Sequence, residues 1–95
     1  MSEASAPYVN HCSRCGDGLL RLYRCGHCGT VVAICDECEL VWQDIERVSR
    51  DPRAPADASF PACPGCGASS STWIRLDTQA IRLAQLESHV RGESE

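Results

Sequence analysis

The sequence predicts a small, β-rich α+β fold that combines a short antiparallel sheet, two four-cysteine metal sites and a C-terminal helix. Three observations lead to this prediction. The 95 residues include eight cysteines, which form four Cys-x-x-Cys pairs. Short runs of β-branched and aromatic residues, typical of strands, lie between the pairs. A segment with apolar residues at helical spacing follows the last pair.

The cysteine pairs predict zinc. A tight Cys-x-x-Cys turn lets two thiolates bind one ion, whereas the cysteines of a disulfide framework are usually scattered. Eight thiolates supply two tetrahedral Zn²⁺ sites with four ligands each, and a chain with only 5% aromatic residues needs such support. The four pairs are Cys12/Cys15, Cys25/Cys28, Cys35/Cys38 and Cys63/Cys66.

Residues 1–10, MSEASAPYVN, are predicted to form a flexible N-terminal tail. They have neither the basic start nor the apolar run of a signal peptide. Elsewhere the chain has no stretch close to the roughly 20 apolar residues that span a membrane. We therefore expect a cytoplasmic, reducing setting and no membrane contact.

Residues 11–76 are predicted to form a double zinc-ribbon-like domain. Residues 19–24 and 30–34 are rich in apolar, aromatic and β-branched residues and predict two strands of a hairpin, with the second cysteine pair at its tip. Glycine follows three of the pairs, where a turn around a metal needs positive φ. Glu39 follows the third pair instead, which makes that turn the least regular.

Strand length favours one grouping of the cysteines. A strand of six residues spans about 20 Å, so the tip and the base of the hairpin cannot share an ion whose Zn–S bonds are about 2.3 Å. The first pair would then join the third, and the second would join the fourth. A sequential grouping stays open if residues 16–24 fold back, and a nested one would join the two closest pairs. The favoured interleaved sites are Cys12, Cys15, Cys35 and Cys38 at the base, and Cys25, Cys28, Cys63 and Cys66 at the tip.

Three segments carry a resemblance to a known class. Residues 12–16, CSRCG, residues 25–29, CGHCG, and residues 63–67, CPGCG, resemble the zinc-ribbon or rubredoxin-knuckle class. The resemblance covers residues 11 to about 76 and implies zinc binding. Such ribbons occur in transcription factors, ribosomal proteins, enzyme appendages and interaction modules, so the class implies little about function.

The remaining elements follow from local patterns. Residues 40–42 predict a third strand, residues 49–61 hold three of the five prolines and predict a loop, and residues 72–76 predict a last strand. Trp42 and Trp73 are expected to pack in the core; the alternative is that they bridge the two metal sites. Residues 77–92 predict a helix, with Asp77 as N-cap and Gly92 beyond its end. This helix would cover the core or dock on a partner.

The charge argues against nucleic acid. The formal net charge is −4, and each four-thiolate zinc site would add about −2. A protein that binds the phosphate backbone is usually basic. The alternative of a nucleic-acid-binding ribbon depends on Arg14, Arg21 and Arg24 around the predicted hairpin. All nine basic residues are arginines, which we interpret as a codon bias of a bacterial source.

Catalysis is not expected. Four cysteines per ion leave no open position for water, and a thioredoxin-like pair would need a βαβ setting. His11 and His27 could each replace a cysteine ligand, and His89 is expected to face solvent. The acidic residues 36, 37 and 39 are expected to form a solvated turn. We therefore predict a non-catalytic protein-interaction or regulatory module with a protein partner, ahead of nucleic-acid binding and of a redox or zinc enzyme.

Overall fold

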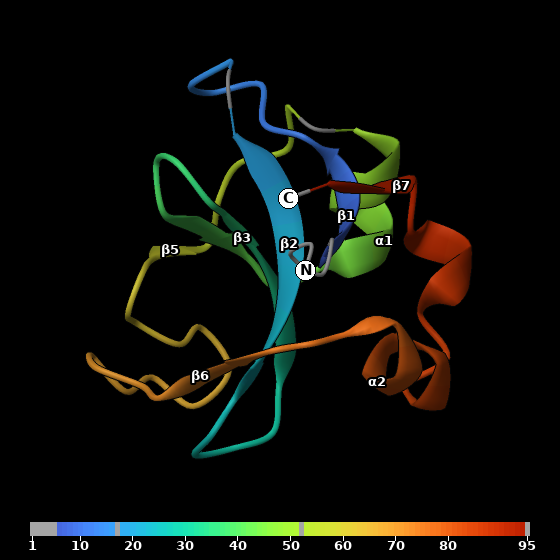
Figure 1. The fold of residues 1–95 in the computed structure, drawn as a ribbon. Helices are drawn as coiled ribbons and strands as arrows, with labels where there is room; N and C mark the ends of the chain where they lie inside the picture. Colours follow the sequence, from blue (N-terminus) through green and yellow to red (C-terminus); the bar gives the residue numbers. More distant parts are fainter. Residues whose placement is uncertain (1–5, 17, 52, 95) are drawn as a thin grey trace, which may run out of the picture.

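The computed structural model describes residues 6–16, 18–51 and 53–94 and places most of them around one antiparallel sheet (Figure 1). The strand order is β5-β4-β3-β2-β1-β7, and β6 also pairs with β2. The elements, in chain order, are β1 (Ala6–His11), β2 (Leu19–Cys25), β3 (Val31–Cys35), β4 (Leu40–Trp42), α1 (Ile45–Arg50), β5 (Ala58–Ser59), β6 (Trp73–Arg75), α2 (Thr78–Leu83), the 3₁₀ turn η1 (Glu87–His89) and β7 (Gly92–Ser94).

The β2–β3 hairpin forms the centre of the sheet. Its register runs from Leu20 opposite Cys35 to Arg24 opposite Val31, which confirms the two predicted strands. The other edge of β2 is divided between two strands: β1 pairs with its first half, and β6 pairs with its second half. One long strand therefore runs from the first cysteine pair to the second.

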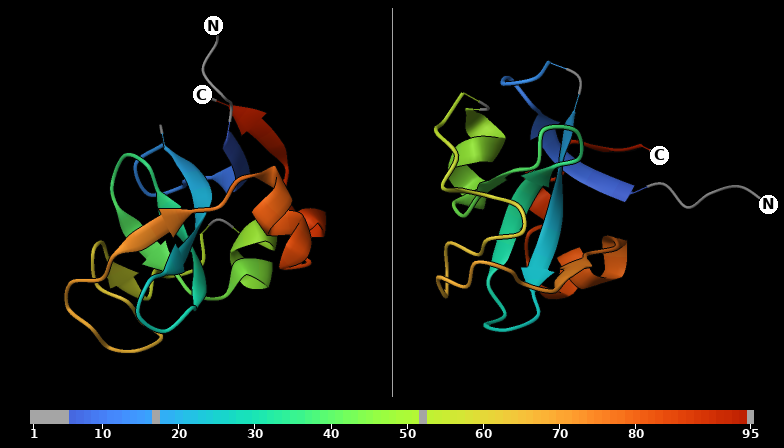
Figure 2. Two further views of the ribbon diagram at one scale, coloured as in Figure 1. Left: turned by 60° about the horizontal axis from the view of Figure 1, so that its bottom comes forward. Right: turned by 90° about the vertical axis from the view of Figure 1, so that its left-hand side faces the viewer.

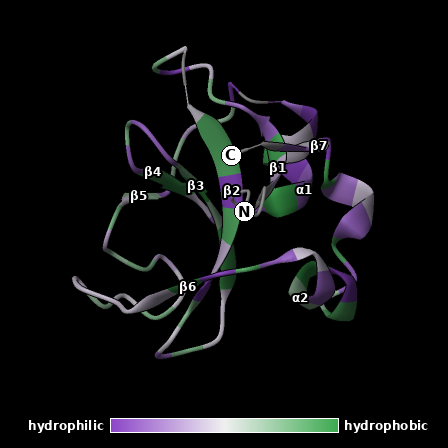
Figure 3. Ribbon diagram, in the orientation of Figure 1, coloured by the Kyte–Doolittle hydropathy of each residue, from purple (hydrophilic) through white to green (hydrophobic). Residues whose placement is uncertain are grey.

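Side chains alternate between the two faces of this sheet, as the period of a strand requires. Leu20 and Leu22 of β2 belong to the larger core cluster, whereas Tyr23 packs against the smaller one. Both helices cover the larger cluster, on the same side of the hairpin (Figures 1 and 2). Colouring by hydropathy shows β2 and β3 as largely apolar (Figure 3). The core is thus two thin layers on either side of one hairpin.

The prediction of a flexible tail over residues 1–10 is wrong for residues 6–10, which belong to β1. Residues 1–5 lie outside the part of the chain that the structure describes. Val9 is fully buried beside β2, and the buried Asn10 side chain donates to the carbonyl oxygens of Val48 and Ser49. The strand is held by pairing partners far away in sequence, β2 on one edge and β7 on the other. Local composition does not carry that information.

The predicted C-terminal helix over residues 77–92 is also shorter than expected. Asp77 is its N-cap, since its carboxylate accepts the N–H of Ala80 at 2.8 Å. The helix ends at Leu83, because Gln85 adopts a left-handed conformation with φ of 61° that ends the helical run. Gly92 lies in β7, where it pairs with Tyr8 of β1, instead of capping a helix.

The predicted third strand over residues 40–42 is confirmed as β4, but a helix follows it where no helix was predicted. The Asp44 carboxylate caps α1 by accepting the N–H of Arg47, and Ile45 and Val48 are buried. Trp42 and Trp73 pack in different clusters on opposite faces, so they do not form one bridge between the metal sites. Within the described residues, neither helix has the length and apolarity needed to cross a membrane.

Candidate metal centres

All four cysteine pairs fold into the same turn. In each turn the carbonyl oxygen of the first cysteine accepts the N–H of the residue four positions later, at 2.9–3.2 Å. That residue has a left-handed backbone in every case, with φ between 63° and 79°. Glycine fills three of these positions and adopts this conformation without strain. The four residues are Gly16, Gly29, Glu39 and Gly67.

Each turn buries its first cysteine and leaves its second more accessible. The first cysteines are at most 2% exposed. Backbone N–H groups donate to three of these buried sulfurs at 3.3–3.4 Å, from His27, Glu37 and Gly65. Such donors stabilise a thiolate, because they supply partial positive charge to a sulfur that has lost water.

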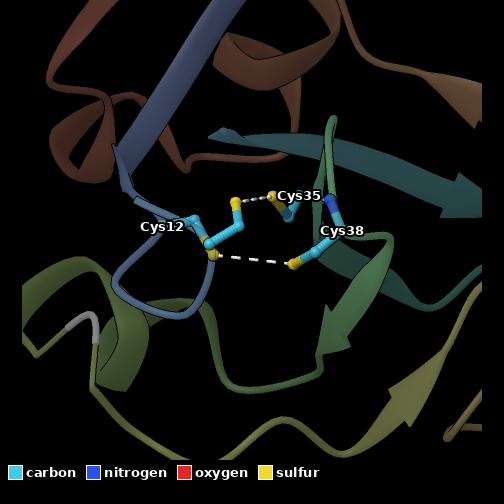
Figure 4. Close-up of side chains that lie close together, drawn as sticks. Cys12, Cys35 and Cys38 are labelled. Atoms are coloured by element: carbon cyan, nitrogen blue, oxygen red, sulfur yellow. Dashed lines mark hydrogen bonds between the residues drawn. The ribbon is translucent and has the colours of Figure 1, made fainter. Parts of the chain in front are cut away.

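The base cluster forms where the β1–β2 loop meets the β3–β4 turn. The Cys12 and Cys38 sulfurs lie 3.7 Å apart, and the Cys15 and Cys35 sulfurs lie 3.6 Å apart. Figure 4 shows Cys12 facing Cys38, with the Cys35 sulfur in the same group. The ligand atoms of all four residues lie within 4.8 Å of one another.

The tip cluster forms at the opposite end of the hairpin. The Cys25 and Cys66 sulfurs are 4.0 Å apart, and those of Cys28 and Cys63 are 3.7 Å apart. The loop after β5 carries Cys63 and Cys66 to this position before β6 returns along β2. Thus the structure adopts the interleaved grouping of the cysteines, with tip and base separated by the length of β2 and β3.

These clusters have the geometry of tetrahedral metal sites. Four sulfurs at about 2.3 Å from a central ion are about 3.8 Å apart, which agrees with the 3.6–4.0 Å between two pairs of sulfurs in each cluster. Within the described residues, each cluster contains cysteine alone. A tetrahedral four-sulfur set suits zinc or iron and does not suit hard ions such as Mg²⁺. Each cluster could therefore bind one such ion.

Two thiols of the base cluster have raised pKa values. Burial raises the pKa of Cys35 and Cys38, because a thiolate is poorly hydrated in the protein interior. Backbone N–H donors to these two sulfurs offset only part of that effect. A metal ion in the base site would have to displace these protons.

The tip cluster is more favourable to thiolates. Burial raises the pKa of Cys25, but backbone N–H groups of Cys28 and His27 and two neighbouring side chains outweigh it and bring the pKa to about 6. The Thr30 hydroxyl, 3.1 Å from the Cys28 sulfur, lowers the pKa of that thiol. Only Cys63 is shifted upward here, to about 11, again because of burial.

Two features of the base site were not visible in the sequence. Arg21 is buried and donates to Asp36 at 3.1 Å, so β2 holds the third cysteine turn by an ion pair. Asp36 also accepts the N–H of Leu19 at 2.9 Å. Gly18 packs so closely that a Cβ atom there would collide with the Cys35 sulfur. The Gly18 N–H donates to the Cys15 sulfur at 3.3 Å.

The other predicted residues lie outside both clusters. His11 is exposed, with its ring 5.4 Å from that of Tyr8 and tilted against it, and His27 is exposed within its turn. Neither belongs to a cluster, so neither replaces a cysteine. His89 is half-buried beside Ser49, contrary to the prediction that it faces solvent. The acidic turn is not simply solvated either, because Asp36 is bound by Arg21.

Comparison with known proteins adds no relative. No family model matches the chain, and neither a curated protein nor a solved structure is significantly similar to it. The geometry of the clusters and the surface around them are therefore the guides to function.

Proposed function

We propose that this chain binds two zinc ions, one in each cluster, and that both ions are structural. The observation that carries the proposal is the match between the sulfur–sulfur distances and a tetrahedral shell at two separate sites. Zinc is favoured over iron because it has no redox chemistry and is the usual ion in closed Cys₄ sites. When bound, it would supply a fixed cross-link between distant segments of the chain.

The proposed role is non-catalytic. Four thiolates complete a tetrahedral shell, so neither site offers a position at which a substrate or a water molecule could be activated. Within the described residues both clusters consist of cysteine alone. His11 and His27 therefore do not form a mixed set of cysteine and histidine ligands. The chemistry of the donor set thus supports a scaffold over a redox or zinc enzyme.

A protein-interaction or regulatory module is the role that we propose for this scaffold, in a reducing, cytoplasmic setting where thiolate clusters persist. Exposed apolar side chains on the surface support this role. Three large apolar side chains are exposed, at 40%, 43% and 79% for Phe60, Ile74 and Leu83. Exposed apolar side chains form a contact surface for a protein partner where they make up one contiguous patch.

Nucleic-acid binding is the alternative, and the arginines weaken it. Arg14 and Arg24 are exposed, but Arg21 is buried and paired with Asp36, so it contributes little to a phosphate-binding face. The formal charge of −4 opposes a polyanion as well. Heparin chromatography separates the two roles: the zinc-loaded chain should pass through at low salt. Salt-dependent retention, together with DNA or RNA binding, would instead support the alternative.

Metal analysis tests the central proposal. Purified, reduced protein should contain two zinc ions per chain by elemental analysis, and X-ray absorption should show four sulfur neighbours at about 2.3 Å around zinc. The variants Cys12→Ser and Cys63→Ser should each lose one ion and keep the other. Iron in place of zinc, or oxygen and nitrogen neighbours around the ion, would contradict the proposal.

A further inference from the structure

A cavity of about 580 Å³ lies between helix α1 and the η1 turn. These two elements pack against each other (Figure 1). The lining contains none of the eight cysteines, so the cavity is separate from the metal clusters. Its size falls in the range of small-molecule sites, roughly 300–1,000 Å³. The polar residues that line it are Glu46, Ser49, Arg50, Ser88, His89 and Arg91.

The cavity is locally cationic in an acidic protein. Two guanidinium groups and one imidazole line it, against a single carboxylate. The whole chain carries a formal charge of −4. Positive charge that gathers in a hollow of a negative molecule favours an anionic ligand there.

Arg91 is held in place without a charged partner. Its Nη2 atom donates to the Ser49 carbonyl oxygen at 3.0 Å, and that oxygen also accepts from the Asn10 side chain. Among the described residues no carboxylate pairs with Arg91. The guanidinium is therefore positioned by neutral groups and keeps N–H donors and its full charge for a ligand.

Arg50 contributes a second guanidinium that an anion can recruit. It pairs with Glu46 at 3.0 Å, and the two side chains are 77% and 61% exposed. An exposed pair one helical turn apart is weak in water, because solvent screens both charges. An anion in the cavity can therefore compete with Glu46 for Arg50.

Ser49 and His89 are not a nucleophile and its base. The Ser49 hydroxyl donates its only proton to the Glu46 carbonyl oxygen at 2.9 Å. The His89 Nδ1 atom lies 3.3 Å from that hydroxyl oxygen and donates to it in the tautomer that carries a proton on Nδ1. This arrangement fixes the imidazole and does not activate the serine, so the cavity has the character of a binding site.

We propose that this cavity binds the phosphate group of a small phosphate monoester. Arg50 and Arg91 would approach its oxygens from two different segments of the chain, and Ser88 and His89 also line the cavity. Guanidinium groups match phosphate geometry through paired N–H donors. Phosphate offers three acceptor oxygens, one more than a carboxylate, and so fits donors that come from several sides.

Calorimetric titration of the zinc-loaded full chain with phenyl phosphate tests the proposal. Arg50→Gln and Arg91→Gln should each weaken binding about tenfold, because each removes a charge-assisted contact. Glu46→Gln should strengthen it about threefold, since Arg50 is released from its partner. Arg75→Gln, an equal change of charge on β6 outside the cavity, should alter affinity less than twofold.

Circular dichroism and zinc content verify that each variant is folded. If Arg91→Gln perturbs the fold, the exposed Arg50 decides the outcome. The proposal fails if the wild-type chain shows no saturable binding, or if Arg75→Gln weakens binding as much as Arg50→Gln. It fails equally if acetate binds as tightly as phenyl phosphate, or if a short oligonucleotide binds more tightly than the monoester.

Discussion

Glu39 adopts a conformation that glycine adopts in the other three cysteine turns. Its φ of 63° is left-handed, which costs an L-residue roughly 1–2 kcal/mol. The turn is kept because the Glu39 N–H donates to the Cys35 carbonyl oxygen at 3.2 Å and because Cys35 and Cys38 must both reach the base cluster. The sequence already marks this turn as the irregular one, but it does not show that the backbone is the same.

Replacing Glu39 with glycine should stabilise the metal-loaded protein by about 1 kcal/mol. The strain disappears, and the gain is reduced by the greater freedom of glycine in the unfolded chain. Urea denaturation of the zinc-loaded form measures the change. Glu37→Gly in the same turn is the matched control, because Glu37 has no left-handed backbone to relieve and should gain nothing. Equal stability changes in both variants would contradict the assignment of strain to Glu39.

The two clusters should respond differently to acid. Burial raises the pKa of two thiols at the base, Cys35 and Cys38. At the tip it raises the pKa of Cys63 to about 11, but the pKa of Cys25 is lowered to about 6 and that of Cys28 is lowered as well. Protons compete with a metal for thiolates, and thiols with raised pKa values compete from a higher pH. As the pH falls from 8, the base should therefore release zinc first.

Amide NMR can follow this release site by site. The N–H of Gly18 donates to Cys15 in the base cluster, and the N–H of His27 donates to Cys25 in the tip cluster. During acid titration of the zinc-loaded chain, the Gly18 signal should shift at a higher pH than the His27 signal. Coincident transitions, or a tip that changes first, would show that the pKa difference does not control release.

At the scale of elements, the sequence predicts the strands of the hairpin well and the ends of the chain poorly. Strands β2 and β3 were identifiable because their β-branched and aromatic residues lie between fixed cysteine turns. The partners β1 and β7 meet through residues more than 80 positions apart, such as Tyr8 and Gly92. No local pattern encodes that pairing. The sequence alone therefore predicts a tail over residues 6–10 and helix over residues 84–92.

The ion pair between β2 and the third cysteine turn should matter for stability. The Arg21 side chain is 4% exposed, and its carboxylate partner Asp36 also accepts the N–H of Leu19. Asp36→Ala removes the carboxylate that forms an ion pair with a buried guanidinium, which should cost about 3 kcal/mol. Glu37→Ala, which removes a neighbouring exposed carboxylate, should cost less than about 0.5 kcal/mol. Urea unfolding of the two zinc-loaded variants measures both values, and similar losses would refute this role.

At the scale of the whole molecule, the two clusters would cross-link segments of the chain that the thin core does not hold together. The base joins the β1–β2 loop to the turn after β3, and the tip joins the hairpin turn to the loop before β6. The sequence could predict this grouping because Cys-x-x-Cys spacing marks each ligand pair and strand length favours the interleaved arrangement over the sequential and nested ones. The cavity between α1 and η1 could not be foreseen, since Ser49 and His89 meet there across 40 positions without any spacing signature.

The whole fold should therefore depend on metal. In the absence of zinc, the eight thiols no longer cross-link the chain at two tetrahedral sites. Structural zinc contributes on the order of 10–16 kcal/mol per site at neutral pH. Strong chelation under reducing conditions should abolish the dispersed amide NMR spectrum and the strand signal in circular dichroism. Two equivalents of Zn²⁺ should restore both signals, whereas Mg²⁺ should not, because it prefers oxygen ligands. A native spectrum in fully metal-free, reduced protein would show that packing of the sheet alone supports the fold.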